Sequence, residues 1–236
     1  MIEEWKTRTS LLIGEEGINK LKESKVAVYG IGGVGSFVVE GLVRAGIEKI
    51  ALIDNDIVDI TNINRQIHAN INTVGKRKVD VMKQRILEIN PKAIVDVYMS
   101  DEIANGEENL IDNTFSYVVD TVDTVTTKIK LVEKANKEDV KIISCMGTGN
   151  KMEPTKLEIS DIYKTSICPL ARVIRKELKT RGIKKLKVLY SKEEPIKSKN
   201  VTFKENTIKT IPGSISFVPS VAGLIIAGEV IKDIIK

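Results

Sequence analysis

The chain is poor in the residues that build metal sites and aromatic surfaces. Its 236 residues include two cysteines, one histidine, one tryptophan and only 4% aromatic side chains. Two thiols cannot supply a four-cysteine zinc site, so we expect no structural zinc. Long apolar stretches are also missing, because residues 218–231 are too few to cross a bilayer and include Glu229. With an acidic start and no apolar leader, we expect a cytoplasmic protein with reduced thiols and no membrane partner.

A short apolar run followed by a glycine-rich turn points to phosphate binding. Residues 26–29 have the pattern of a buried parallel strand, and Gly30, Gly32, Gly33 and Gly35 lie between this strand and an amphipathic helix. Gly30 allows a tight turn, Gly32 lets phosphate oxygens approach the backbone, and Gly35 lets the helix pack closely on the strand. The helix start supplies free amides and the positive end of a dipole. A plain turn in a doubly wound sheet remains the alternative.

Polar residues are unusually dense after the second apolar run, at residues 50–53. Asp54 ends that run, where an acidic side chain would accept hydrogen bonds from ribose hydroxyls. Basic side chains directed at one place suit a triphosphate, whose charge moves onto pyrophosphate as the α-phosphorus is attacked. The pattern therefore favours adenylation over hydride transfer, and a solvated basic loop is the alternative. The candidate nucleotide-binding residues in this stretch are Asp54, Asp56, Asn62, Arg65, Gln66 and Lys78.

Two carboxylates follow a third apolar run, at residues 117–119. Asp120 and Asp123 are expected on the ligand side of the sheet, where parallel strands end. One of them can hold Mg²⁺ through oxygen and water ligands. Asp123 is equally suited to cap a helix that begins near Thr124, and Asp120 to accept a hydrogen bond at the end of its strand.

The order of these patterns predicts an α/β fold, a Rossmann-like doubly wound and mostly parallel sheet. We expect a core at about residues 20–150 and a strand and helix extension at about 151–236, packed on the same sheet within one domain. The helix pattern at 218–231, with Ser220 as a cap and the small residue Gly223 on it, should pack on the sheet or on a second subunit. Residues 193–199 are charged and interrupted by proline, which predicts a mobile loop over the substrate.

The glycine turn, the run from Asn62 to Gln66, Lys78 and Asp123 together resemble the ubiquitin-activating-enzyme-like adenylyltransferases. The resemblance implies that Asp54 binds ribose, that the Asn62 to Gln66 run and Lys78 face the phosphates of ATP, and that Asp123 organises Mg²⁺ for catalysis. It also implies a homodimer in which Arg8 reaches the ATP of the opposite subunit, unless Arg8 is an ordinary surface residue. The expected catalytic residues are thus Arg65, Lys78, Asp123 and Arg8.

Within that superfamily, five segments resemble the tRNA threonylcarbamoyladenosine dehydratases: 64–69, 161–165, 168–178, 188–195 and 213–220. The likeness runs from about Arg8 to Ile235. It implies that ATP adenylates the threonine carboxylate of threonylcarbamoyladenosine beside the tRNA anticodon, and that the ureido group then displaces AMP and closes a ring. Two alternatives remain: activation of a ubiquitin-like sulfur-carrier protein, with an adduct on Cys168, and an NAD-linked protein. A monovalent cation site and a sulfur-relay partner also stay open.

A basic helix pattern at residues 169–180 agrees with an RNA partner. The net charge is +5, and a stripe of cations on this helix could engage tRNA phosphates, although a solvated helix face is the alternative. Leu170, Val173, Ile174 and Leu178 form its expected apolar side. We expect Cys145 to be buried, Cys168 to be more exposed, and His68 to be structural or on the surface. The expected tRNA-binding residues are Arg172, Arg175, Lys176 and Lys179.

Overall fold

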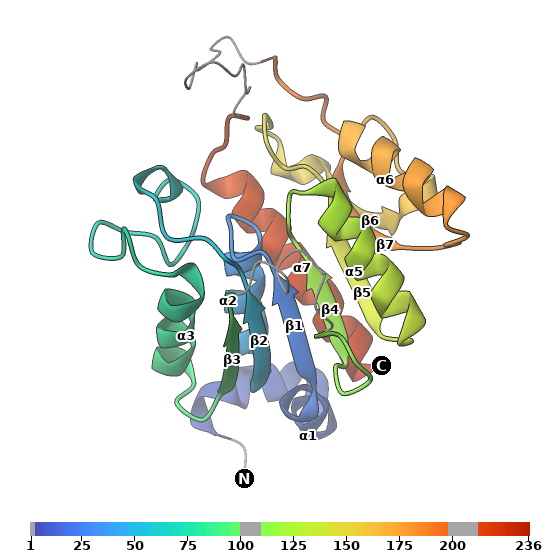
Figure 1. Ribbon diagram of the computed structural model, residues 1–236. Helices are drawn as coiled ribbons and strands as arrows, with labels where there is room; N and C mark the ends of the chain where they lie inside the picture. The colour runs from blue at the N-terminus through green and yellow to red at the C-terminus, as the bar shows by residue number, and fades with distance from the viewer. Residues whose placement is uncertain (1–2, 100–109, 198–211) are drawn as a thin grey trace.

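A computed structural model describes residues 3–99, 110–197 and 212–236, which form a seven-stranded sheet flanked by helices (Figure 1). The strand order is β3-β2-β1-β4-β5-β7-β6, and only β6 runs antiparallel to its neighbour. The strands are β1 Lys25–Tyr29, β2 Lys49–Ile53, β3 Ile94–Tyr98, β4 Tyr117–Asp120, β5 Lys141–Cys145, β6 Leu157–Asp161 and β7 Lys187–Ser191. The α/β, Rossmann-like fold predicted from the sequence is therefore confirmed.

Helices cover both faces of the sheet. The α-helices are α1 Thr7–Glu23, α2 Gly35–Ala45, α3 Lys78–Ile89, α5 Val125–Lys137, α6 Pro169–Thr180 and α7 Phe217–Ile235. Short 3-10 helices occur at Glu4–Lys6, Ile60–Asn62, Pro154–Lys156 and Ile162–Lys164. Successive side chains of a strand point to opposite faces, so Val26 and Val28 join the core under α2 and α7 while Ala27 and Tyr29 join the opposite core. Burial on both faces explains why these strands are continuously apolar.

Helix α7 packs directly on α2. A Cβ added at Gly223 would lie 2.5 Å from the carbonyl oxygen of Val34, and one at Gly41 would lie 2.7 Å from the Cβ of Ala227. The small residues therefore let the two helix backbones approach closely. The helix starts at Phe217, so Ser220 lies within its first turn and does not cap it as expected. No helix in the described ranges combines the length and apolarity that a membrane span needs.

The segment after β7 is partly fixed to the fold. The Glu193 carboxylate accepts hydrogen bonds from the backbone amides of Met152 and Glu153, at 2.9 Å for each nearest pair, and Glu193 is buried. The expectation of a mobile loop is therefore wrong at Glu193, because a buried carboxylate needs these donors. Residues 198 and 199 of that predicted loop lie outside the described residues.

Candidate active site

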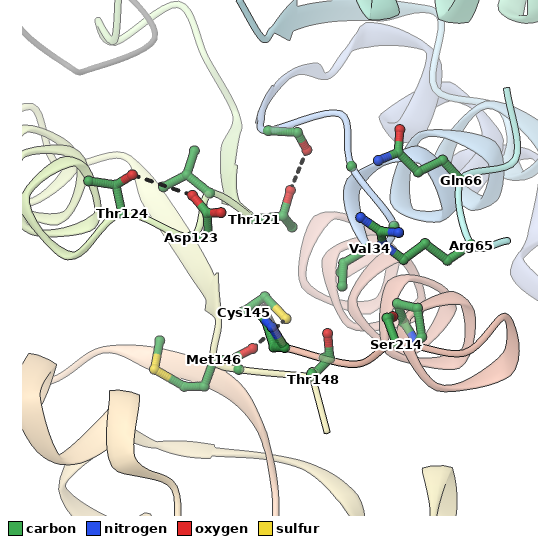
Figure 2. Close-up of a pocket in the computed structure, with 18 of the residues that line it drawn as sticks. Val34, Arg65, Gln66, Thr121, Asp123, Thr124, Cys145, Met146, Thr148 and Ser214 are labelled. Atoms are coloured by element: carbon green, nitrogen blue, oxygen red, sulfur yellow. Dashed lines mark hydrogen bonds between the residues drawn. The ribbon is translucent and has the colours of Figure 1, made fainter. Parts of the chain in front are cut away.

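A pocket of about 1030 Å³ opens at the carboxyl ends of the central strands (Figure 2). Its lining falls into two groups, which we call the glycine-loop half and the far half. The first includes Gly30, Gly32, Gly33, Asp54, Asp56, Asn62, Arg65, Gln66, Lys78 and Asp123, and the second includes residues 147–151, 168–170 and 212–214. Strand order reverses between β1 and β4, which is where open α/β sheets bind ligands.

The glycine turn has two kinds of glycine. Gly30 has a φ of 85°, and a Cβ there would lie 2.9 Å from the carbonyl oxygen of Thr121. A Cβ at Gly35 would lie 1.9 Å from the Gly30 carbonyl oxygen, so the start of α2 can approach the turn only without a side chain. At Gly32, by contrast, an added Cβ would meet no atom within 4 Å. Gly30 and Gly35 thus serve the fold, and Gly32 keeps the pocket open.

Asp54 connects the end of β2 to the glycine turn. Its carboxylate accepts hydrogen bonds from the amides of Ile31 at 2.6 Å and Asp56 at 2.8 Å. Burial raises the pKa of Asp54, and the nearby Lys78 ammonium and the two amides oppose that rise. The Lys78 Nζ lies 2.5 Å from an Asp56 oxygen and 3.9 Å from an Asp54 oxygen. These three charged residues therefore form one cluster at the ligand side of β2.

The residues from 62 to 66 differ in how their polar groups are used. The Asn62 side chain accepts a hydrogen bond from the Asp59 amide at 3.1 Å, within a capping box that shapes the loop. The Arg65 guanidinium donates to the carbonyl of Thr61 and to Asn64, each at 2.9 Å. Gln66 is buried, and its side-chain oxygen has no hydrogen-bond partner among the described residues. A buried acceptor of this kind in a pocket wall suits a ligand that donates a hydrogen bond.

The two carboxylates after β4 have separate environments. Asp123 is exposed to the pocket, across from Arg65 (Figure 2), and the hydroxyl of Thr124 lies 3.3 Å from one of its oxygens. Helix α5 begins at Val125 with Thr124 in the cap position, so the alternative in which Asp123 caps the helix is wrong.

Asp120 is fully buried at the end of β4 and accepts hydrogen bonds from Ser144 and from Lys128, whose Nζ lies 3.1 Å from both carboxylate oxygens. The expected hydrogen bond at the strand end is confirmed. Sequence reasoning missed Lys128, although a lysine on the inward side of α5 was the available signal.

Arg8 and the basic side chains of α6 lie outside the pocket lining. Arg8 is exposed on α1, which lies near the amino ends of the strands (Figure 1). On α6, Arg172, Lys176 and Lys179 are exposed, whereas an Arg175 nitrogen donates to the carbonyl of Thr165 at 2.9 Å. The basic stripe predicted on this helix is therefore narrower at its centre than the sequence suggests.

The apolar side of α6 differs from the prediction at one position. Val173 is 45% exposed, so its expected place on the apolar side is wrong. Ala171, Ile174 and Leu178 form the buried stripe instead, because spacings of three and four residues place them on one face.

The cysteines and the histidine are all buried. Burial raises the pKa of the Cys145 thiol to about 12, and the expected burial of Cys145 is confirmed. Cys168 is only 4% exposed, so its expected exposure is wrong, because the start of α6 packs into the core around Ile162 and Ile174. Burial, followed by the Lys78 and Arg85 charges, lowers the pKa of His68 to about 4. His68 is therefore a neutral interior residue and not a surface one.

The described ranges contain no group of three histidine, cysteine, aspartate or glutamate side chains placed to hold a metal ion.

The sequence did not predict the far half of the pocket. Its main polar side chains, Asn150 and Lys151, come from the β5–β6 connection, where no motif marks them.

The fold and pocket define a nucleotide-binding α/β protein, and the ThiF family matches residues 7–236, so the chain belongs to the ThiF family. It is 45% identical to the tRNA threonylcarbamoyladenosine dehydratase of Bacillus subtilis, covering 98% of this chain and 94% of that protein. The Escherichia coli dehydratase is 37% identical and the match covers 75% of this chain and 67% of that one. A structure of the E. coli dehydratase TcdA with ATP matches with a TM-score of 0.85 and 31% identity, covering 99% and 96% of the two chains. The resemblance inferred from the sequence is confirmed.

Proposed function

We propose that this protein is an ATP-dependent tRNA threonylcarbamoyladenosine dehydratase. The observation that supports it most is that a phosphate-type glycine turn and a second, separate lining face one shared pocket. Adenylation needs ATP and an acid bound next to each other, and the two linings could each hold one of them. The similarity to the dehydratases also extends over nearly the whole chain and therefore includes both halves of the pocket.

The reaction has two steps that share one carboxylate. An oxygen of the threonine carboxylate attacks the α-phosphorus of ATP, the bond to the β-phosphate oxygen breaks, and pyrophosphate leaves with the electron pair. The ureido nitrogen of the same modified base then attacks the acyl carbon, loses its proton, and expels AMP as the ring closes. Because both reacting groups belong to one side chain, an effective molarity on the order of 10⁵ M or more removes the need for a protein nucleophile.

Arg65, Lys78 and the start of α2 would stabilise the phosphate charge that develops in the first step. Lys78 is held by Asp56 at 2.5 Å, so it is already oriented toward the pocket before ATP binds. Helix α2 begins without a side-chain cap, next to Gly33 and Val34 in the pocket lining, so the positive end of its dipole would attract phosphate oxygens. Asp54, Asn62 and Gln66 would position the ribose and phosphates.

Asp123 fits a hydrated Mg²⁺ ion. Its carboxylate faces the pocket and is exposed, and Mg²⁺ usually keeps several waters and binds one or two carboxylates together with substrate phosphates. The ion would offset phosphate charge as pyrophosphate departs. Asp123 itself would fix the position of the β- and γ-phosphates relative to the acid.

In a homodimer, Arg8 would reach the ATP of the opposite subunit. It is exposed on α1 and does not line the pocket of its own subunit. Leu11 and Leu12 on the same helix are 81% and 87% exposed, which is unusual for large apolar side chains and supports a covering partner. We further propose that the enzyme works in the cytoplasm, and that Arg172, Lys176 and Lys179 contact tRNA phosphates, with Arg175 supporting the start of α6.

Purified protein tests the proposal directly. Incubation with ATP, Mg²⁺ and tRNA that carries threonylcarbamoyladenosine should yield AMP, pyrophosphate and a nucleoside lighter by one water in mass spectrometry. The same tRNA without the modification should yield no AMP above background. An unchanged nucleoside at saturating ATP would contradict the proposal, and AMP formation that depends on a protein ending in Gly-Gly would favour a sulfur-carrier activator instead.

A further inference from the structure

One buried lysine differs from all the others in the described part of the chain. Four lysines are nearly excluded from solvent, and three of them have a carboxylate partner at 2.6, 2.5 and 3.1 Å: Lys6 with Glu48, Lys78 with Asp56, and Lys128 with Asp120. Lys151, which is 5% exposed, is the fourth. No carboxylate of the described residues lies within 4.0 Å of its ammonium group.

Among the described residues, the Lys151 ammonium has only a neutral hydrogen-bond partner. Its Nζ donates to the backbone carbonyl of Glu193, while the Glu193 carboxylate is directed to the amides of Met152 and Glu153. Burial lowers the pKa of Lys151, and the nearby Cys168 and Glu193 groups oppose that change. A buried ammonium that shares one proton with a carbonyl keeps most of its desolvation cost. An incoming anion would supply the missing countercharge.

The position of Lys151 in the pocket indicates which anion would supply this countercharge. Lys151 lines the far half of the pocket, and every other described lining residue there is uncharged: glycines, prolines, a threonine, an asparagine, a cysteine, a leucine and a serine. Helix α6 begins in the same wall, at Pro169, and has no side-chain cap. The far half thus presents positive charge alone, next to the space where the glycine-loop half would hold ATP.

The loop that carries Lys151 is fixed on two sides. Asn150 adopts a φ of 57°, donates its amide to the Gly213 carbonyl at 2.8 Å and accepts from the Gly213 amide at 2.6 Å. Its own carbonyl accepts from the Ile196 amide at 2.8 Å. These bonds hold the backbone before any ligand arrives, so Lys151 is preorganised and need not be ordered by binding.

We propose that Lys151 binds the carboxylate of the acid that this enzyme adenylates, an assignment that rests on the proposed function. One carboxylate oxygen pairs with the ammonium, and the other is left to attack the α-phosphorus. After the acyl-adenylate forms, the paired oxygen is its carbonyl oxygen. Negative charge develops on that oxygen as the ureido nitrogen attacks, so the same ammonium stabilises ring closure.

Lys151→Met tests the assignment because methionine keeps most of the length of the lysine side chain without its charge or donor. Binding is measured for tRNA with and without threonylcarbamoyladenosine, in the presence of Mg²⁺ and a non-hydrolysable ATP analogue. We expect the variant to bind the modified tRNA about tenfold or more weakly, as loss of a charged hydrogen bond implies. The unmodified tRNA and the analogue alone should bind as they do to the unaltered protein.

Three companion variants make the outcome unambiguous. Lys156→Met, on the exposed surface of the same connection, removes the same charge outside the pocket and should change nothing. Lys151→Gln removes the charge but keeps a donor for the Glu193 carbonyl, so it separates loss of the charge from loss of that hydrogen bond. Lys151→Arg keeps the charge and should restore part of the binding. Thermal melting confirms that each variant is folded.

Two results would overturn the assignment. Equal weakening of both tRNAs would mean that Lys151 contacts a phosphate, and unchanged binding of the modified tRNA by folded Lys151→Met and Lys151→Gln would mean that it contacts no substrate anion. Both results require that the unaltered protein distinguishes the two tRNAs. If it does not, and forms no AMP with either, the proposed dehydratase function fails instead.

Discussion

The two halves of the pocket treat charge in opposite ways. In the glycine-loop half, the buried charged groups have partners within the protein: Lys78 lies against Asp56, and Asp54 is held by backbone amides. Arg65 and Asp123 are more exposed and contact only neutral groups among the described residues. In the far half, Lys151 has no carboxylate partner among the described residues. Internal pairing suits a site that must hold its shape while a polyphosphate enters and leaves. An unpaired cation suits a site whose partner is supplied by the substrate.

The largest effect on stability should come from substitution of the glycines that shape the glycine-loop half of the pocket. Gly35→Ala places a Cβ 1.9 Å from a backbone oxygen, so we expect a loss of several kcal/mol in the free energy of unfolding, or no folded protein. Gly32→Ala meets nothing within 4 Å and should melt normally while binding ATP more weakly. Thermal melting and calorimetry with Mg·ATP check the pair. Equal melting temperatures for the two variants would contradict the division of roles.

Removal of the Arg65 side chain tests whether the glycine-loop half of the pocket contributes to catalysis. Arg65→Ala should lower the rate of AMP formation by about 10²- to 10³-fold, because one donor to the developing charge is lost. Arg77→Ala is the matched control, since Arg77 pairs with Asp80 on the exposed start of α3 and does not line the pocket. Rates are measured from labelled ATP under single-turnover conditions. A similar loss in both variants would indicate a general effect on the loop.

Low pH should destabilise the folded protein because His68, which is buried near Lys78, becomes protonated. The folded pKa of about 4 lies below the ordinary value of 6.5, so the unfolded chain binds more protons between those values and stability falls as pH decreases through that window. The full loss is about 3 kcal/mol and is complete near pH 4. Urea unfolding of His68→Gln should show a smaller decline over the same window. Identical pH profiles would contradict this account.

The smallest effect is expected on the outer face of α6. Lys176→Ala and Lys179→Ala should each weaken tRNA binding a few-fold, equally for modified and unmodified tRNA, and should lower the salt dependence by about one ion. Arg175→Ala should instead lower the melting temperature, because its guanidinium bonds to Thr165. Filter binding over a salt series measures the first effect. A larger loss of binding for one tRNA than for the other in either lysine variant would show that these residues contact the modified base.

The same contrast explains what the sequence could predict. The glycine turn of the glycine-loop half is local: strand, turn and helix follow one another within about twenty residues, so the apolar run and the glycine spacing identify it. The far half joins residues near 150, 169 and 213, and no short motif connects them. The special character of Lys151 depends on which partners it lacks, and a pattern of residue types does not contain that information.

Two errors have related causes. Cys168 is not more exposed than Cys145, contrary to the expectation, because the start of α6 packs its thiol into the core. Val173 was assigned to the apolar side by residue type, while the helix buries Ala171, whose small side chain carries a weak apolar signal. Tertiary packing, and not local propensity, decided both positions.

Oxygen labelling tests the central claim most directly. The threonine carboxylate of threonylcarbamoyladenosine in tRNA is labelled at both oxygens with ¹⁸O, and the products of one turnover with ATP are examined by mass spectrometry. Carboxyl adenylation followed by ring closure predicts one heavy oxygen in AMP and one retained in the cyclic nucleoside. Unlabelled AMP, or label in inorganic phosphate with ADP as the other product, would contradict the account.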